Sequence, residues 1–131
     1  YKIINTKNKV VGHRKASKIL VYQDLLKSCD IGLSSVILKK NLLNKKKNFL
    51  FPDIKTKEDY ILWLKLAKKG IGLFGLNEEL TAWRKLNNSL SSSTLQKIKD
   101  GYKVYRYYLK FGIIKSLIFL IILSFNSVLK Y

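Results

Sequence analysis

A helical pattern between Thr56 and Gly70 is the feature that most restricts how this 131-residue chain can fold. Its apolar residues recur three and four positions apart, as one helix face requires, at Tyr60, Trp63, Leu64 and Ala67. Thr56 stands at the expected N-cap, and Glu58 and Asp59 occupy the first turn, where the helix dipole favours carboxylates. Gly70 follows the last periodic residue and suits the C-terminal cap. The segment therefore predicts a helix that begins with an acidic pair.

Shorter segments on both sides of this helix predict a mixture of strands and helices. Runs rich in β-branched and apolar residues are typical of strands, whereas one short segment has helical character. The expected elements are a hairpin or irregular segment over 1–20, a helix over 22–27, a buried strand over 31–38, a solvated helix or loop over 39–48, and strands over 71–76 and 80–84.

The last third of the chain differs in composition. Residues 86–94 form a polar loop, and Thr94 is placed to cap a long helix that starts near Leu95. Between residues 111 and 125 the only charge is Lys115. A spanning helix needs about 20 apolar residues, so we expect this run either to lie in a membrane interface or to pack on another part of the protein. We accordingly divide the chain into residues 1–95 and a helical, apolar tail over 96–131.

The net charge of +18, from 26 basic and 8 acidic residues, favours polyanionic partners such as nucleic acid, anionic lipid or phosphorylated ligands. Only Arg14, Arg84 and Arg106 are arginines, whereas readers of base edges usually need the guanidinium fork. We therefore expect no nucleic-acid partner. The alternative is a basic nucleic-acid-binding module that would combine lysines 45–47 with the tyrosines between 102 and 108.

Cysteine and histidine usage argues against a zinc site. Cys29 is the only cysteine, which excludes an internal disulfide and favours a reducing compartment. His13 is the only histidine and lies in a lysine-rich stretch. We expect Cys29 to act as a small buried apolar residue and His13 to lie on the surface.

Two clusters of polar residues have a possible chemical role beside a structural one. Asp59, with Glu58 next to it, either caps its helix only or acts as a general base that takes a proton from an attacking hydroxyl. If the pair only caps, the chain is a non-catalytic membrane-peripheral protein. Arg84, beside the polar loop, either clamps a diphosphate or pairs with Glu78 or Glu79.

Several segments together resemble the second half of bacterial family 2 glycosyltransferases that build surface polysaccharides. They are YQDLL at 22–26, DIGLSSVIL at 30–38, Phe51-Pro52, EDYILWLKL at 58–66 and AWR at 82–84. The resemblance implies an α/β fold, the C-terminal part of a GT-A-type nucleotide-diphospho-sugar transferase. It also implies inverting transfer of a sugar from a nucleotide-sugar donor to a saccharide or lipid-linked acceptor. Such an enzyme would be cytoplasmic and peripheral to the inner face of the bacterial membrane.

The resemblance assigns roles to individual residues. Asp59 matches the usual catalytic base of the family, with Glu58 in the same motif, and Trp63 on the next turn would line the acceptor pocket. The family's small hydroxyl pair and its Tyr-Arg pattern are matched at Ser34, Ser35 and Arg84, although Trp83 replaces the tyrosine.

The donor half of the family is missing from this sequence. No two of its aspartates are two positions apart, so the family's Asp-x-Asp metal motif is absent, and there is no Gly-rich phosphate loop. The first residue is Tyr1 and there is no Met. We therefore expect a fragment with negligible transfer activity by itself. The divalent metal of the full enzyme, Mn or Mg, would have its ligands outside this chain.

Overall fold

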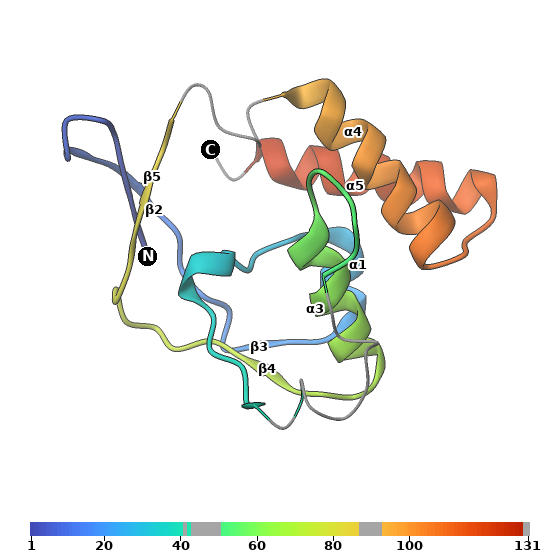
Figure 1. The fold of residues 1–131 in the computed structure, drawn as a ribbon, viewed down its shortest axis with the longest axis horizontal. Helices are drawn as coiled ribbons and strands as arrows, with labels where there is room; N and C mark the ends of the chain where they lie inside the picture. Colours follow the sequence, from blue (N-terminus) through green and yellow to red (C-terminus); the bar gives the residue numbers. More distant parts are fainter. Residues whose placement is uncertain (41, 43–50, 87–92, 130–131) are drawn as a thin grey trace.

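A computed structural model describes residues 1–40, 42, 51–86 and 93–129. Within these residues the chain is a mixed α/β structure of two small sheets and a group of helices (Figure 1). The expectation of an α/β chain with a C-terminal helix is confirmed. The predictions for residues 43–48 and 87–92, and for the lysines at 45–47, concern residues that the structure does not describe.

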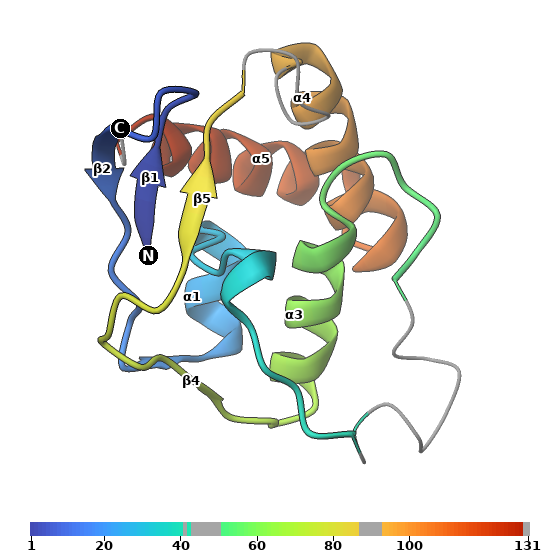
Figure 2. The ribbon, with the colours of Figure 1, turned by 60° about the vertical axis from the view of Figure 1, so that its left-hand side comes forward.

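The first sheet has the order β2-β1-β5. Strands β1 (Lys2–Ile4) and β2 (Val10–His13) form the predicted antiparallel hairpin, and β5 (Ala82–Arg84) pairs parallel to β1 (Figure 2). The second sheet is the antiparallel pair of β3 (Ile19–Leu20) and β4 (Leu73–Phe74). The strands predicted over 71–76 and 80–84 are therefore present in shorter form, and β5 brings residues 82–84 beside the N-terminal hairpin.

Helices α1 (Tyr22–Lys27) and α3 (Glu58–Lys68) form as predicted and pack on each other. Gly70 ends α3 with φ of 74°, a left-handed conformation that glycine adopts without steric cost. The N–H groups of Gly70 and Ile71 donate to the carbonyls of Ala67 and Leu66, which satisfies two of the last free carbonyls of the helix. The predicted C-terminal cap is confirmed.

The N-cap of α3 was predicted wrongly. Lys57, not Thr56, holds this position, with a left-handed backbone at φ of 72°. Thr56 is buried, and its N–H and hydroxyl both donate to Asp100 Oδ2, at 3.1 and 2.9 Å. Local preference would place the Thr56 side chain on the end of α3. It bonds instead to Asp100, which lies 44 residues away in the sequence.

The buried strand predicted over 31–38 is also wrong. Residues Leu33–Ser35 form one 3₁₀ turn, η1, and Ile37 is 98% exposed. Ser35 Oγ donates to the Gly32 carbonyl at 2.8 Å, and the Ser35 N–H donates to the same carbonyl. Serine side chains that bond to nearby backbone in this way favour turns over strands.

The long helix predicted from Leu95 is a regular α-helix only as far as Lys103. Helix α4 (Thr94–Lys103) is capped by Ser93, whose Oγ accepts from the Gln96 N–H, so the predicted cap at Thr94 is one residue late. A π-helical turn, η3 (Val104–Tyr108), follows, and α5 (Ile113–Val128) packs back against α4 and α1. The two helices approach closely at Gly101, where a Cβ would lie 2.9 Å from Leu120 Cδ1.

Helix α5 has one packed face and one exposed apolar face. Ser116 and Leu123 are buried. The Tyr105 ring stacks on the rings of Phe111 and Phe119, which are tilted relative to each other. The opposite side exposes Ile113, Ile114, Leu117, Ile118, Ile121, Phe125, Val128 and Leu129. Within the described residues, no helix has both the length and the hydropathy to cross a membrane.

The buried core lies where α1, α3, η3 and α5 meet. It consists of Leu25, Leu26, Tyr60, Ile61, Leu62, Trp63, Leu64, Leu66, Val104, Tyr105 and Leu123. Two tyrosine hydroxyls bind the end of α1, since Tyr60 donates to the Leu25 carbonyl and Tyr105 to the Leu26 carbonyl. The core therefore fixes α3 from behind and leaves its N-terminal turn facing the sheet.

Candidate functional site

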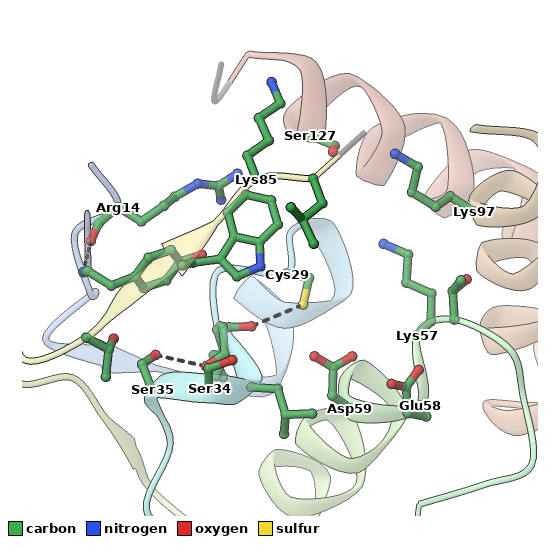
Figure 3. Close-up of a pocket in the computed structure, with 18 of the residues that line it drawn as sticks. Arg14, Cys29, Ser34, Ser35, Lys57, Glu58, Asp59, Lys85, Lys97 and Ser127 are labelled. Atoms are coloured by element: carbon green, nitrogen blue, oxygen red, sulfur yellow. Dashed lines mark hydrogen bonds between the residues drawn. The ribbon is translucent and has the colours of Figure 1, made fainter. Parts of the chain in front are cut away.

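An open cleft of about 870 Å³ lies between the first turn of α3 and strand β5. Its lining comes from segments far apart in the sequence (Figure 3). They are residues 29 and 31–35 around η1, 55–59 at the start of α3, 81, 83, 85 and 86 around β5, with Tyr1, Arg14, Lys97 and Ser127. This volume is at the upper end of the range of about 300–1,000 Å³ that is usual for small-molecule sites.

The acidic pair of α3 lies on the floor of this cleft. The carboxylates of Glu58 and Asp59 both point into it in Figure 3. Burial raises the pKa of Asp59 above its ordinary value, and the Glu58 charge adds to this, whereas the Tyr60 N–H, which donates to Asp59 Oδ1 at 2.7 Å, and Lys57 lower it. Asp59 is therefore a stronger base than an exposed aspartate.

Ser34 and Ser35 lie across the floor from Asp59. Both are exposed residues of the η1 turn and line the cleft. The structure thus brings together four of the residues predicted for the site, Glu58, Asp59, Ser34 and Ser35. Their hydroxyl and carboxylate groups are those that bind sugar hydroxyls by hydrogen bonds.

Trp63 does not line the cleft. It is 1% exposed and belongs to the core, where its Nε1 has no hydrogen-bond partner among the described residues. A helix advances about 100° per residue, so Trp63, four positions after Asp59, lies on the same side of α3 but one turn further along the helix. Here the second turn of α3 is covered by packing, and stacking of a sugar on Trp63 has no support.

Arg84 also points away from the cleft. Its Nη1 donates to the Asn5 carbonyl at 3.0 Å and to Asn8 Oδ1 at 2.8 Å, so it braces the β1–β2 turn. The alternative pairing with Glu79 is not observed either, because Glu79 bonds to the surface residue His13. Alternation along β5 places the preceding residue, Trp83, on the cleft side.

The sequence interpretation missed Trp83 and the basic rim of the cleft. Five cationic side chains line it, namely Arg14, Lys55, Lys57, Lys85 and Lys97. Trp83 was not predicted as a site residue because it departs from the Tyr of the family pattern, although an indole ring can also stack on a sugar. Lysines so numerous in the sequence carry no signal that distinguishes those near the cleft.

Cys29 lies at the edge of the cleft, with its Sγ 4.0 Å from the Ile31 carbonyl oxygen. Burial, and next the charge of Asp59, raise the pKa of this thiol from 9.0 to about 11. The side chain is therefore a neutral thiol at physiological pH. It is half-buried against the core and not fully buried as expected.

The structure offers little to the nucleic-acid alternative. Tyr105, in the centre of the proposed stacking surface, is fully buried, and Tyr107 is the one large exposed aromatic in the η3 turn. Stacking platforms for single strands need several exposed rings.

No group of three or more His, Cys, Asp or Glu side chains that could hold a metal ion occurs among the described residues. In the cleft, two carboxylates stand beside five cationic side chains. Divalent Mg needs several oxygen ligands and Mn prefers the same type, so this donor set does not fit either ion.

The curated proteins that this chain is similar to are bacterial glycosyltransferases. One is the putative teichuronic acid biosynthesis glycosyltransferase TuaG of Bacillus subtilis (strain 168), 36% identical over 91 residues, which are 70% of this chain and 35% of that protein. Another is UDP-Glc:alpha-D-GlcNAc-diphosphoundecaprenol beta-1,3-glucosyltransferase WfgD of Escherichia coli, 36% identical over 105 residues, or 79% of this chain and 40% of the relative. The similarly named WfaP of Escherichia coli is 38% identical over 77 residues, or 59% and 29% of the two chains.

The chain is therefore a distant homologue of part of the bacterial glycosyltransferases of surface-polysaccharide synthesis, and the suspected resemblance is confirmed. It spans no more than 40% of the length of these relatives. No protein-family model matches the chain. No solved structure matches it significantly.

Proposed function

We propose that this chain is the acceptor-side part of an inverting family 2 glycosyltransferase of GT-A fold, which transfers a hexose from a nucleotide sugar to a saccharide or lipid-linked acceptor. Two relatives are named as glucosyltransferases that use UDP-Glc and GlcNAc-diphosphoundecaprenol, which supports both substrate classes. The observation that carries the proposal is the Asp59 carboxylate, partly buried on the floor of an open cleft at the first turn of α3.

In this proposal Asp59 takes the proton from the acceptor hydroxyl as that oxygen attacks the anomeric carbon of the donor. The bond from this carbon to the diphosphate breaks, and its electron pair leaves with the nucleoside diphosphate. The raised pKa of Asp59 favours proton transfer, because the efficiency of a general base rises with its proton affinity. Ser34, Ser35 and the Trp83 indole are placed to orient the acceptor sugar.

The donor nucleotide and a divalent metal would bind to residues outside this chain. The cleft does not fit such an ion, so the donor part of the enzyme would hold the metal next to the acceptor site. Isothermal titration tests this division. We expect the 131-residue chain to bind an acceptor saccharide weakly and to bind UDP with Mn no better than it binds other anions of equal charge. Specific, tight binding of UDP and Mn by this chain would contradict the proposal.

We further propose that the protein acts at the inner face of the bacterial membrane, with an anionic bilayer against the exposed side of α5. This side combines eight large apolar residues with the nearby cations Lys110 and Lys115, and such a pairing suits an interfacial helix. Co-sedimentation with phosphatidylglycerol vesicles tests it. Ile121→Glu should lower the bound fraction, whereas the same substitution at exposed Leu80, outside α5, should not. If wild type stays in the supernatant at low salt, a protein segment covers this face instead.

The catalytic role is tested in the full-length protein by Asp59→Asn, which removes the base with little change of shape. We expect kcat to fall by about 10²-fold or more, the range typical of a lost general base. Asp53→Asn is the matched control, because it removes an exposed carboxylate six residues away that does not line the cleft. If Asp59→Asn retains turnover within about twofold of the wild type, the acidic pair serves only as a helix cap.

A further inference from the structure

The cationic side chains of the cleft have no role in the proton transfer assigned to Asp59. Arg14 and Lys85 have interactions of their own, but Lys55, Lys57 and Lys97 alone outnumber the two carboxylates of the cleft, which keeps a positive charge beside its basic group. Lys97 makes no ion pair with any of the described carboxylates. Cations held near one another repel, and burying part of their surface costs free energy unless an anion compensates them.

Two of these cationic side chains point toward the same part of the cleft. Figure 3 shows the side chains of Lys57 and Lys97 extending toward the same open space above the carboxylates of Glu58 and Asp59. Lys57 stands at the start of α3 and Lys97 on the second turn of α4, so two separate elements supply them. The cleft therefore has an acidic floor that suits a hydroxyl to be deprotonated and a basic side that suits phosphate oxygens.

The basic side also borders α5. Ser127, in its last turn, lines the cleft near Lys85, while Ile121, Phe125 and Val128 of the same helix are exposed. These apolar residues lie roughly 100–160° around the helix from Ser127, so the exposed apolar side of α5 faces away from the cleft. Within the cleft, the acidic floor and the lysines beside it suit a sugar followed by a diphosphate.

We propose that Lys97, together with Lys57, forms an anion subsite for the diphosphate of a lipid-linked acceptor whose terminal sugar faces Asp59. This inference rests on the proposed function, and it adds which residues recognise the part of the acceptor next to its sugar. Charge-assisted contacts to two lysines contribute both affinity and the direction in which the acceptor enters.

The test is a binding titration of the 131-residue chain at low ionic strength, followed by NMR. The main probe is N-acetylglucosaminyl diphosphate carrying a short alkyl group, and the comparison probes are methyl N-acetylglucosaminide, UDP and inorganic pyrophosphate. We expect the diphosphate probe to bind about tenfold more tightly than the methyl glycoside, which corresponds to one good charge-assisted contact. Shifts should be concentrated at Ser34, Asp59, Trp83 and Lys97.

Matched lysine variants separate a subsite from the general field of a chain with a net charge of +18. Lys97→Ala and Lys99→Ala remove the same charge from the same helix, but Lys99 is exposed and does not line the cleft. We expect Lys97→Ala to weaken the diphosphate probe about three- to tenfold and to leave the methyl glycoside unchanged, while Lys99→Ala changes neither by more than about twofold. Equal losses in the two variants would overturn the subsite.

The remaining outcomes distinguish the subsite from the function on which it rests. If the methyl glycoside binds at Asp59 and the diphosphate probe binds no more tightly, the subsite is wrong and the acceptor site stands. If neither sugar probe binds, the proposed acceptor site itself fails. If UDP matches the sugar diphosphate and loses the same affinity in Lys97→Ala, the lysines serve the donor diphosphate, which overturns the assignment to the acceptor.

Discussion

Asp100 of α4 holds Thr56, the residue two positions before α3, through two hydrogen bonds to a single carboxylate oxygen. The same oxygen accepts from the Gln96 side chain at 2.8 Å, and Lys103 Nζ lies 3.5 Å from the other oxygen. Asp100 is fully buried. This contact ties the C-terminal helices to the segment that positions Glu58 and Asp59, so the cleft depends on a residue that does not touch it.

Asp100→Ala should therefore destabilise the chain. It leaves the Thr56 N–H and hydroxyl buried without an acceptor, and a loss of about 2–4 kcal/mol in the free energy of unfolding is expected for such a network. Urea denaturation followed by circular dichroism measures it. Lys99→Ala, on the exposed side of the same helix, should change stability by no more than about 0.5 kcal/mol. Equal stability of the two variants would mean that Thr56 finds water as a substitute partner.

The Asp100 contact also makes stability depend on pH. Burial alone would raise the pKa of Asp100, but the hydrogen bonds from Gln96 and Thr56 outweigh it and hold the pKa below its ordinary value of 3.8. A lowered pKa in the folded state stabilises the protein above the unfolded value, and the gain is lost as the pH falls through the folded pKa. The difference in stability between wild type and Asp100→Asn should thus be full at neutral pH and shrink below about pH 4. A difference that stays constant down to pH 2 would contradict this.

The parts of the fold that depend on interactions between neighbouring residues in the sequence were predictable, and those that depend on distant residues were not. Helix α3 and its end at Gly70 depend on local periodicity and on one residue with positive φ, and both were predicted. The cap at Thr56 failed because its partner lies 44 residues away. The strand over 31–38 failed because apolar composition does not reveal whether a neighbouring strand is available to pair with it.

The same distinction applies to the site. Asp59 and the serines 34 and 35 come from motifs that sequence reading recognises, and the fold places them in one cleft. Trp63 and Arg84 belong to the same motifs, yet the structure uses them in the core and at the hairpin turn. Trp83 and Lys97 enter the cleft only through the packing of β5 and α4, which no local pattern encodes.

Substitution of Trp63 should change stability, and substitution of Trp83 should change sugar affinity. The sequence motif suggested that Trp63 is the sugar-binding residue. Trp63→Phe fills most of the core volume and removes an unpartnered N–H, so we expect a loss of only about 1 kcal/mol, against about 3–5 for Trp63→Ala. Neither change should alter the affinity for methyl N-acetylglucosaminide while the protein is folded. Trp83→Ala should instead weaken this sugar about tenfold, since a stacking surface in the cleft is lost. Titrations of the two variants that gave the reverse order would return the sugar site to Trp63.

The hydroxyl of Tyr60 should contribute to stability rather than to chemistry. It donates to the Leu25 carbonyl and lies 3.0 Å from the Tyr105 hydroxyl, which in turn donates to the Leu26 carbonyl. Removal of one hydroxyl leaves a buried carbonyl unsatisfied, and we expect Tyr60→Phe to cost about 1–3 kcal/mol. A double-mutant cycle with Tyr105→Phe should give a coupling of about 0.5 kcal/mol or more. Strict additivity would mean that the two hydroxyls act independently.

The reactivity of the Cys29 thiol depends on the charge of Asp59, so this charge can be probed without a substrate. Its pKa of about 11, against an ordinary 9.0, reduces the thiolate at neutral pH about 100-fold relative to a free thiol. Alkylation by iodoacetamide, followed by mass spectrometry, should accordingly be slow near pH 7 and accelerate with each unit of pH up to about 11. Asp59→Asn removes the second-largest cause of the raised pKa and should speed the reaction severalfold. Glu58→Gln is the control, because Glu58 is not among the groups that shift this thiol. If the two variants accelerate alkylation equally, Asp59 does not raise the pKa of the thiol more than Glu58 does. The described geometry of the cleft floor would then be wrong.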